Sequence, residues 1–344
     1  MTEKQTSTTK QPLDGQMDGA QLAAGDWSEA LASAAGNGWK VRQRSGTVLQ
    51  ASRHRPVVSY RVSYEEAGST TSTLKIVIGK AYYRGDGAGT FEVMQRLWAE
   101  GFSDENCLCI TEPIAWVPER KLLLQGEASG QPLYDHLPVP ERGIARVRDA
   151  GRWLAKLHTT DAGSASVPLP ARFETNKLTT YATGLAEAHP ELGDRVRSVA
   201  EAAAAALEAS EEDVQVLTHG DFQPKNIYVA RHRTTVIDFD RHALAPPARD
   251  LAHFLGQCLT MSWVRAGSFE RIAPWNAAFL AAYGATGGNA PASLPAYLAR
   301  TFLEVLYYKL VVKPVADPRF APAWLDQCER WMTGELLQET PGAT

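Results

Sequence analysis

The hydrophobic pattern of this 344-residue chain changes from a strand-like to a helical period, and this change constrains the fold more than any other feature. From Thr47 to Ala81 the chain predicts successive strands in the segments TVLQAS, VVSYRVSYEE and TLKIVIGKAYY, because Val, Ile, Thr and Tyr favour extended backbone. After the turn-rich connector GEASGQP, the segment RVRDAGRWLAKLH places apolar residues at helical spacing. The sequence therefore predicts an α+β fold, with a small antiparallel β-rich part followed by a larger, mainly helical part.

These periods divide the chain into three regions. Residues 1–25 are rich in Thr, Gln, Gly and Asp and lack an apolar core, so a disordered tail is expected there. Residues 26–128 are expected to form the N-terminal lobe, with a helix over FEVMQRLWAEGF and further strands at Cys107–Ile110 and Lys121–Gln125. Residues 129–340 are expected to form the helical lobe, with two short strands, NIYVAR and TTVIDFD, embedded in it. Apolar spacing predicts further helices at Thr179–His189, Gly193–Glu208, Asp250–Val264, Pro274–Tyr283, Leu294–Lys313 and Ala323–Leu337.

Composition excludes several classes of protein. A net charge of −4 gives no overall attraction to phosphate backbones, so nucleic acid is not the expected partner. Because the chain lacks a run of eighteen apolar residues and an apolar block after a basic start, neither a membrane span nor a secretory signal is expected. Its four cysteines include no C-x-x-C pair, which argues against a zinc knuckle or a disulfide framework. Reduced thiols and a cytoplasmic location are expected.

The chemistry-bearing stretch runs from Leu217 to Phe254 and contains two Asp and one Asn around a predicted hairpin. Asp221 and Asn226 lie five residues apart on a loop, and Asp238 follows the returning strand. Because a hairpin folds its two strands back on each other, the three oxygen-bearing side chains are expected to meet at one end. Magnesium prefers oxygen ligands and takes only one or two from protein, so this end is a predicted magnesium site.

The motif HGDFQPKN followed by IDFD resembles the catalytic core of the aminoglycoside phosphotransferase and choline kinase-like superfamily, whose members share the protein-kinase fold. The resemblance implies a two-lobed fold that uses ATP and Mg²⁺. It implies that Asp221 orients the acceptor hydroxyl and accepts its proton, that Asn226 and Asp238 bind magnesium, and that His219 and Gly220 shape the catalytic loop. Since an ordinary Asp is a weak base at neutral pH, aiming the hydroxyl is its first expected role.

The same resemblance implies a nucleotide-binding lysine on the third strand. Lys80 in LKIVIGKAYY matches this pattern, with Lys75 as its competitor. Glu92 is expected at the start of the following helix, where it would hold the lysine over the phosphates, and Glu100 is the second choice.

The connector LLLQGEASGQPL resembles the hinge of that superfamily, whose backbone would contact adenine. The implied contacts run through Gln125, Glu127 and Ala128, and Gly130 and Leu133 fit the usual ending of this hinge.

Three further positions complete the expected site. Asp250 in ARDLAHF is expected to brace the catalytic loop and not to bind metal. Asp240 stands where protein kinases have the Gly of D-F-G, which leaves it as an auxiliary residue. The hairpin expected over the phosphates reads QASRHRPVV without G-x-G-x-x-G, so the cluster Arg53–Arg55 is a candidate source of charge.

The acceptor of the phosphate is expected to be a small molecule. Asp250 is only the twelfth residue after Asp238, with no A-P-E element between them, so the long segment that docks protein substrates in protein kinases is not expected. The superfamily suggests an aminoglycoside, amino sugar or amino alcohol, with candidate acids at Glu304, Asp317, Asp326 and Glu329. Two alternatives stay open, a kinase of peptide or protein Ser/Thr in a biosynthetic pathway and an inactive ATP-binding module. The sequence leaves the oligomeric state open.

Overall fold

The computed structural model describes residues 16–161, 163, 167–210, 214–287 and 291–334. These residues form two compact units. The first, here called the sheet unit, extends to Ala99 and includes Thr111–Glu127; the second, the helical unit, comprises Glu100–Ile110 and the chain from Ala128 onward. The expected tail at 1–15 and the final part of the expected helical lobe, 335–340, lie outside the described residues.

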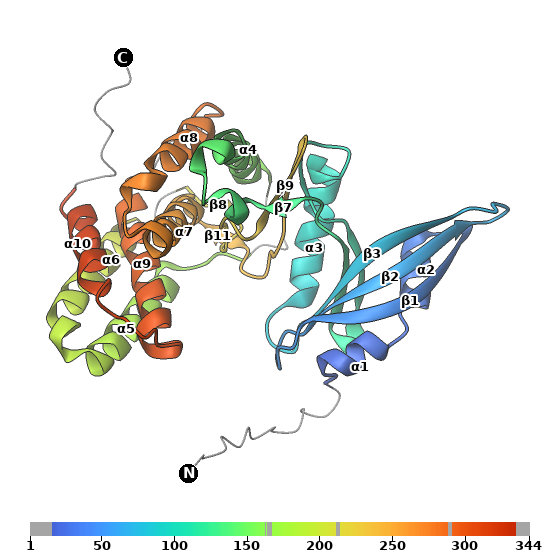
Figure 1. Cartoon of the computed structure of the whole chain (residues 1–344), viewed down its shortest axis with the longest axis horizontal. Helices are drawn as coiled ribbons and strands as arrows, with labels where there is room; N and C mark the ends of the chain where they lie inside the picture. Colours follow the sequence, from blue (N-terminus) through green and yellow to red (C-terminus); the bar gives the residue numbers. More distant parts are fainter. Residues whose placement is uncertain (1–15, 162, 164–166, 211–213, 288–290, 335–344) are drawn as a thin grey trace, which may run out of the picture. The chain divides into compact units, whose positions relative to one another are not determined.

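The sheet unit is built on five antiparallel strands in the order β1-β2-β3-β6-β5 (Figure 1). The predicted strands are confirmed at β2 and β3, while β1 starts before Thr47 and β5 was not predicted from the sequence. The strands span Trp39–Gln50 (β1), Val57–Glu66 (β2), Ser72–Ala81 (β3), Pro113–Val117 (β5) and Leu122–Gly126 (β6).

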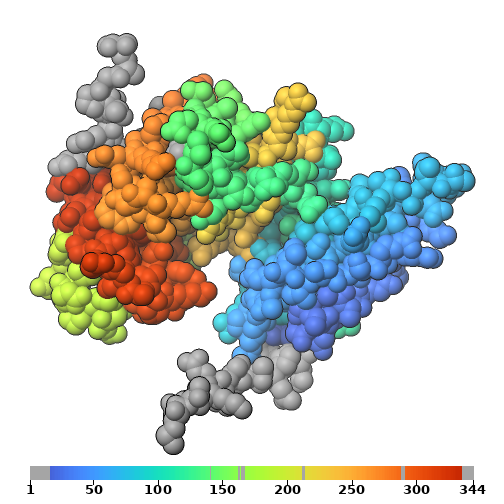
Figure 2. All heavy atoms as spheres, viewed as in Figure 1, coloured from blue at the N-terminus to red at the C-terminus, as the bar shows by residue number. Residues whose placement is uncertain are grey.

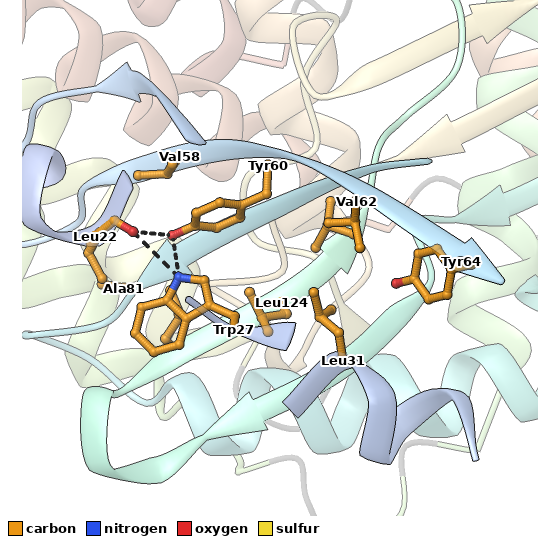
Figure 3. Packing of buried hydrophobic residues seen from close by; sticks show 11 residues of the cluster. Leu22, Trp27, Leu31, Val58, Tyr60, Val62, Tyr64, Ala81 and Leu124 are labelled. Atoms are coloured by element: carbon orange, nitrogen blue, oxygen red, sulfur yellow. Dashed lines mark hydrogen bonds between the residues drawn. The ribbon is translucent and has the colours of Figure 1, made fainter. Parts of the chain in front are cut away.

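Two short helices, α1 (Gly19–Ala24) and α2 (Ser28–Ala35), pack on this sheet. Figure 3 shows their contact: the indole nitrogen of Trp27 donates a hydrogen bond of 2.8 Å to the Tyr60 hydroxyl, which donates one of 2.8 Å to the carbonyl of Leu22. All three side chains are buried in one apolar cluster with the strands. The helices therefore form part of the core of the sheet unit.

The expected disordered tail is wrong from α1 onward. Asp18 begins this helix with a capping box, in which its side chain accepts from the backbone N–H of Gln21 and the Gln21 side chain accepts from the N–H of Asp18. Leu22 is fully buried against the sheet. The few apolar residues of the polar segment 1–25 gave no periodic signal, yet the sheet supplies the surface that buries Leu22.

Helix α3 (Gly87–Leu97) follows the third strand and begins at the N-cap residue Asp86, whose carboxylate accepts from the N–H of Gly89 at 2.8 Å. Its apolar face buries Val93 and Met94. Helix α3 begins well before Glu92, so the expectation that Glu92 starts the helix is wrong. The Asp86 cap explains the earlier start.

The helical unit contains a second sheet in the order β4-β10-β9-β7 and a strand pair β8-β11. Strand β4 runs parallel to β10, and this pairing explains why Glu100–Ile110 belongs with the helices although the sequence placed it in the N-terminal lobe. The strands span Leu108–Ile110 (β4), Gln131–Pro132 (β7), Val216–Thr218 (β8), Ile227–Ala230 (β9), Arg233–Val236 (β10) and Ala243–Ala245 (β11).

Helices pack around these strands, with α9 in contact with α5, α6, α7 and α10. On the face shown in Figure 2, the red atoms of α10 lie beside the yellow-green atoms of α6. Within the described ranges, no helix has both the length and the apolar run needed to cross a membrane. The helices span Pro140–Thr159 (α4), Ala171–Ala188 (α5), Gly193–Ala209 (α6), Ala248–Ala266 (α7), Ala273–Gly284 (α8), Leu294–Tyr307 (α9) and Ala321–Met332 (α10).

The predicted helices are confirmed as elements, but several ends differ. Helix α5 begins before Thr179, and α9 passes into a π-helical turn, Tyr308–Val312, within the segment predicted as one helix. Strands β8 and β11 are three residues each, too short to show alternation in sequence. Residues 335–337 of the last predicted helix lie outside the described residues.

Candidate active site

The predicted hairpin brings its polar residues together. The loop between β8 and β9 carries Asp221 and Asn226, and the backbone N–H of Ile237, just after β10, donates to the carbonyl of Asn226 at 3.0 Å. Asp238 is the next residue after Ile237, so this hydrogen bond holds Asp238 close to Asn226. The side-chain nitrogen of Asn226 donates to Oδ2 of Asp221 at 3.0 Å and to the Asp221 carbonyl at 2.9 Å. The structure thus joins Asp221 to Asn226 directly and brings Asp238 to the same end of the hairpin.

This arrangement fits a magnesium ion with the ligands expected from the sequence. Because Asp221 takes both hydrogens of the Asn226 amide, the amide oxygen is the atom that Asn226 can offer to a cation. Asp238 adds a carboxylate from a backbone with φ of 74°, a left-handed conformation that non-glycine residues adopt rarely and mostly at functional sites. Because Mg²⁺ usually takes only one or two ligands from protein, phosphate oxygens and water would complete the shell.

Three side chains point polar atoms at the Asp221 carboxylate. Besides Asn226 at Oδ2, Gln223 donates to Oδ1 at 3.0 Å, and Nε2 of His253 lies 2.9 Å from the same oxygen. Burial raises the pKa of Asp221, but the close contact with His253 and the charges of His253, Arg241 and His219 outweigh it and hold this pKa well below its usual range. Asp221 is therefore a carboxylate at neutral pH.

His219 connects the catalytic loop to the strand that precedes Asp238. Its Nε2 lies 3.0 Å from the carbonyl of Ile237, and its Nδ1 accepts from the N–H of Asp221 at 3.2 Å. These bonds need a neutral imidazole with its proton on Nε2. Complete burial lowers the pKa of His219 despite the opposing charges of Asp250 and Asp221, which favours the same neutral form.

Asp250, at the start of α7, is hydrogen-bonded to the backbone of the same loop. Its carboxylate accepts from the N–H of His219 at 2.6 Å and from that of Gly220 at 2.7 Å, and His158 Nε2 lies 3.2 Å away. This is the geometry that the expected bracing role requires. Gly220 has φ of 79°, and a Cβ there would lie 2.2 Å from the carbonyl oxygen of Arg241, so only glycine fits.

Aromatic side chains pack against one another around the loop that carries Asp221. Phe222 stacks on Trp153 with ring centres 5.5 Å apart, and Phe239 lies 4.7 Å from the His219 ring. Trp153 is fully buried and donates to the carbonyl of Cys109 at 2.9 Å. Trp153 and His158 are thus packing and bracing residues, and the rings fix the loop on both sides of Asp221.

A ring of charged side chains lies beside the loop, and the sequence did not predict it. The carboxylate of Glu304 lies 3.4 Å from Arg241 and 2.5 Å from Arg300, which lies 2.7 Å from Glu174. Arg249, 3.5 Å from Glu174, closes the ring by donating to the Arg241 carbonyl at 3.0 Å. Charged residues on helices are usually solvated, so only the packing of α5, α7 and α9 reveals that Glu174 and Arg300 are buried.

The acids considered for binding a cationic acceptor all have arginine partners. Besides Glu304 in the ring, Asp326 and Glu329 lie 2.6 Å and 2.8 Å from Arg195. Asp317 pairs with its neighbour Arg319 at 2.7 Å. Their arrangement therefore gives no support of its own to an ammonium-binding site.

The residues expected to bind nucleotide lie on the sheet unit and at its end. Lys80 lies in β3 with its ammonium group 5.4 Å from the ring centre of Tyr82, while Lys75 lies 5.5 Å from that of Tyr64. Glu92 is exposed in the middle of α3. Its pairing with Lys80 stays a prediction.

The expected hinge begins in β6, where Gln125 is buried opposite Ile78 of β3. The chain passes from the sheet unit to the helical unit between Glu127 and Ala128. The change of unit thus falls within the segment that resembles a hinge. Asp240 is partly buried just after Phe239, and its auxiliary role stays a prediction.

Residues 81–297 match the family model described as "Phosphotransferase enzyme family". This match covers well over half of the chain and includes the whole catalytic loop. None of the curated proteins matches the sequence.

Several solved structures share the fold. A choline/ethanolamine kinase family protein from Mesorhizobium loti aligns with a TM-score of 0.54 and 17% identity, over 82% of this chain and 86% of that one. A glucosamine kinase in complex with glucosamine, ADP and inorganic phosphate aligns with 0.55 and 16%, over 95% and 84%. An amicoumacin kinase in complex with AMP-PNP, Ca²⁺ and Ami aligns with 0.53 and 15%, over 84% and 88%. At such identities the likeness concerns the fold, and it confirms the predicted α+β, protein-kinase-like fold.

Proposed function

We propose, from the premise that this chain belongs to the phosphotransferase enzyme family, that it moves the γ-phosphate of ATP to a hydroxyl group of a small molecule. The enzyme class, a phosphotransferase acting on an alcohol group, follows from the family and its kinase neighbours. The observation that carries the specific proposal is the Asp221–Asn226 pair, hydrogen-bonded at one end of a hairpin that also delivers Asp238.

Asp221 would act on the acceptor. Its carboxylate would accept a hydrogen bond from the acceptor hydroxyl and direct the oxygen at the γ-phosphorus. The bond between that oxygen and phosphorus forms as the bond to ADP breaks, and the hydroxyl proton passes to Asp221. Because its pKa is depressed, Asp221 is a poor base, so the proton moves after most of the transfer has occurred.

Magnesium and nucleotide would be held by residues other than this aspartate. The Asn226 amide oxygen and the Asp238 carboxylate would hold Mg²⁺, with Asp240 as an auxiliary acid. The ion would neutralise charge on the phosphate oxygens. Lys80, with Glu92 as its candidate partner, would bind the α and β phosphates, and the backbone from Gln125 to Ala128 would contact adenine.

The acceptor that we propose is an amino sugar, aminoglycoside or amino alcohol. This class rests on the acceptors bound by proteins of similar fold, such as glucosamine, because each acid considered in the helical unit is paired with an arginine. A small acceptor is also favoured by the segment between Asp238 and Asp250, because it contains β11, which is paired with β8. A strand built into the core is not a docking loop for a peptide.

The test is a screen for ADP release with ATP and Mg²⁺ across amino sugars, aminoglycosides, amino alcohols, neutral sugars, sugar acids and hydroxyl-bearing peptides. We expect turnover with an amino-bearing alcohol. If only the hydroxyl-bearing peptides give turnover, the result would support the Ser/Thr kinase alternative. Stabilisation of the protein against heating by Mg²⁺ and ATP, without ADP release with any acceptor, would support the inactive ATP-binding module.

A cytoplasmic location, where ATP is supplied, stays a prediction.

A further inference from the structure

Helix α7 touches the catalytic loop at two places. Asp250, in its first turn, accepts from the backbone N–H groups of His219 and Gly220. His253 follows three residues later, which places it on the same face of the helix. Its Nε2 lies 2.9 Å from Oδ1 of Asp221. One face of α7 thus contacts both the backbone and the side chain of this loop.

Packing alone does not account for a histidine at this position. The His253 side chain is 5% exposed, and its Nε2 is fully buried with no well-aligned hydrogen-bond partner among the described residues. A buried polar nitrogen without compensation destabilises a protein, and an apolar residue such as leucine would fill similar space. The nearest compensating group is the Asp221 carboxylate.

We propose that His253 is a positioning residue that fixes the orientation of the Asp221 carboxylate toward the acceptor hydroxyl. The inference rests on the proposed function, because it assigns His253 a part in the same transfer. Gln223 and His253 hold Oδ1, while Asn226 holds Oδ2. Gln223 and Asn226 belong to the loop itself, whereas His253 comes from α7, which packs on α9, so His253 ties the Asp221 side chain to the helical packing.

The test compares three substitutions at this position in the full chain. His253→Gln can place its amide nitrogen where Nε2 lies, His253→Asn is too short to reach Asp221, and His253→Leu removes the donor while keeping the volume. We expect kcat to fall roughly 10- to 100-fold in the Asn and Leu variants, the effect of losing one polar contact to a charged group, and to fall less than about threefold in the Gln variant. The KM for ATP should not change.

A matched control lies two turns further along the same helix. Thr260 is also buried, and its hydroxyl also has no hydrogen-bond partner within the described part of the chain. Thr260→Val should leave kcat within about twofold of wild type. If the Leu variant does not fold, the comparison of Asn with Gln still decides the proposal, because both are polar and differ mainly in reach. Equal kcat in the Gln and Asn variants would overturn it.

A second readout needs no acceptor and separates this inference from the proposed function. In a crystal structure of His253→Asn, the Asp221 carboxylate should turn away from its present position, whereas it should stay in place in His253→Gln. An unmoved carboxylate in the Asn variant would overturn the positioning role even if the wild type proves active. If the carboxylate moves but the wild type turns over no acceptor, the proposed function fails and the positioning contact stands.

Discussion

The side-chain nitrogen of Asn226 donates to both the carboxylate and the backbone carbonyl of Asp221, at 3.0 Å and 2.9 Å. Asn226 therefore has two tasks. It orients the group that would receive the acceptor proton, and it leaves its own amide oxygen for the proposed Mg²⁺. The proposed catalytic and metal-binding groups would thus be coupled through one amide.

The Asp221→Asn variant should lose transfer and keep nucleotide binding. The substitution preserves shape but removes the charge that aims and deprotonates the hydroxyl, and we expect kcat to fall by about 10²- to 10⁴-fold. Coupled ADP release measures kcat, and titration calorimetry measures the affinity for ATP with Mg²⁺. Turnover within threefold of wild type would show that Asp221 does not act on the acceptor.

The Asp238→Ala variant should lose the effect of magnesium on ATP binding. We expect Mg²⁺ to increase the affinity of the wild type for ATP and to have little effect in the variant, since one of its two protein ligands is gone. The comparison needs ATP titrations with Mg²⁺ and with EDTA for both proteins. Asp317→Ala, at an exposed ion pair, is the control and should behave as the wild type does. A wild type that binds ATP equally with and without Mg²⁺ would contradict the metal site.

The Asp250→Ala variant should be markedly less stable. Removal of the carboxylate leaves the N–H groups of His219 and Gly220 buried without their acceptor, and each such loss costs roughly 1–3 kcal/mol. We expect the free energy of unfolding in urea to fall by about 3 kcal/mol. A midpoint equal to that of wild type would show that the loop does not depend on this brace.

Glu304 should make stability depend on pH in the acid range. Burial raises its pKa, but the charges of Arg300, His253 and Arg241 outweigh burial and lower the pKa of Glu304 from 4.5 to about 2. Because the folded-state pKa is below the unfolded value, its contribution is complete above pH 4.5 and is lost as pH falls toward 2.

The measurement for Glu304 is urea unfolding across that pH range. The free energy of unfolding should fall less steeply with decreasing pH in Glu304→Gln than in wild type. Glu329→Gln, at an ion pair that is 43% exposed, is the matched control and should keep the wild-type slope because solvent screens it. Identical slopes in the Glu304→Gln variant and the wild type would contradict a tightly coupled ring.

The relationship of Asp221, Asn226 and Asp238 could be predicted from the sequence because a single hairpin determines it. Their spacing, together with two short strands, is enough to bring them to one end, whatever the rest of the chain does. The same holds for β2, β3 and the helical periods of α4 and α6, which local hydrophobic patterns specify.

Other features depend on surfaces that the sequence does not display. The sequence placed Leu22 in a disordered tail, but the structure buries it against the apolar face of the sheet. The segment Glu100–Ile110 belongs to the helical unit because β4 pairs with the distant strand β10.

The sequence by itself thus determined the fold class, the family and the three central polar residues, because each depends on short-range spacing. Only the tertiary structure decided that His253 lies against Asp221 and that Glu174 and Arg300 form a buried pair. A helical period shows which face of a helix is buried but not which residue of a distant element it meets, so contacts between α5, α7, α9 and the loop emerge only from packing.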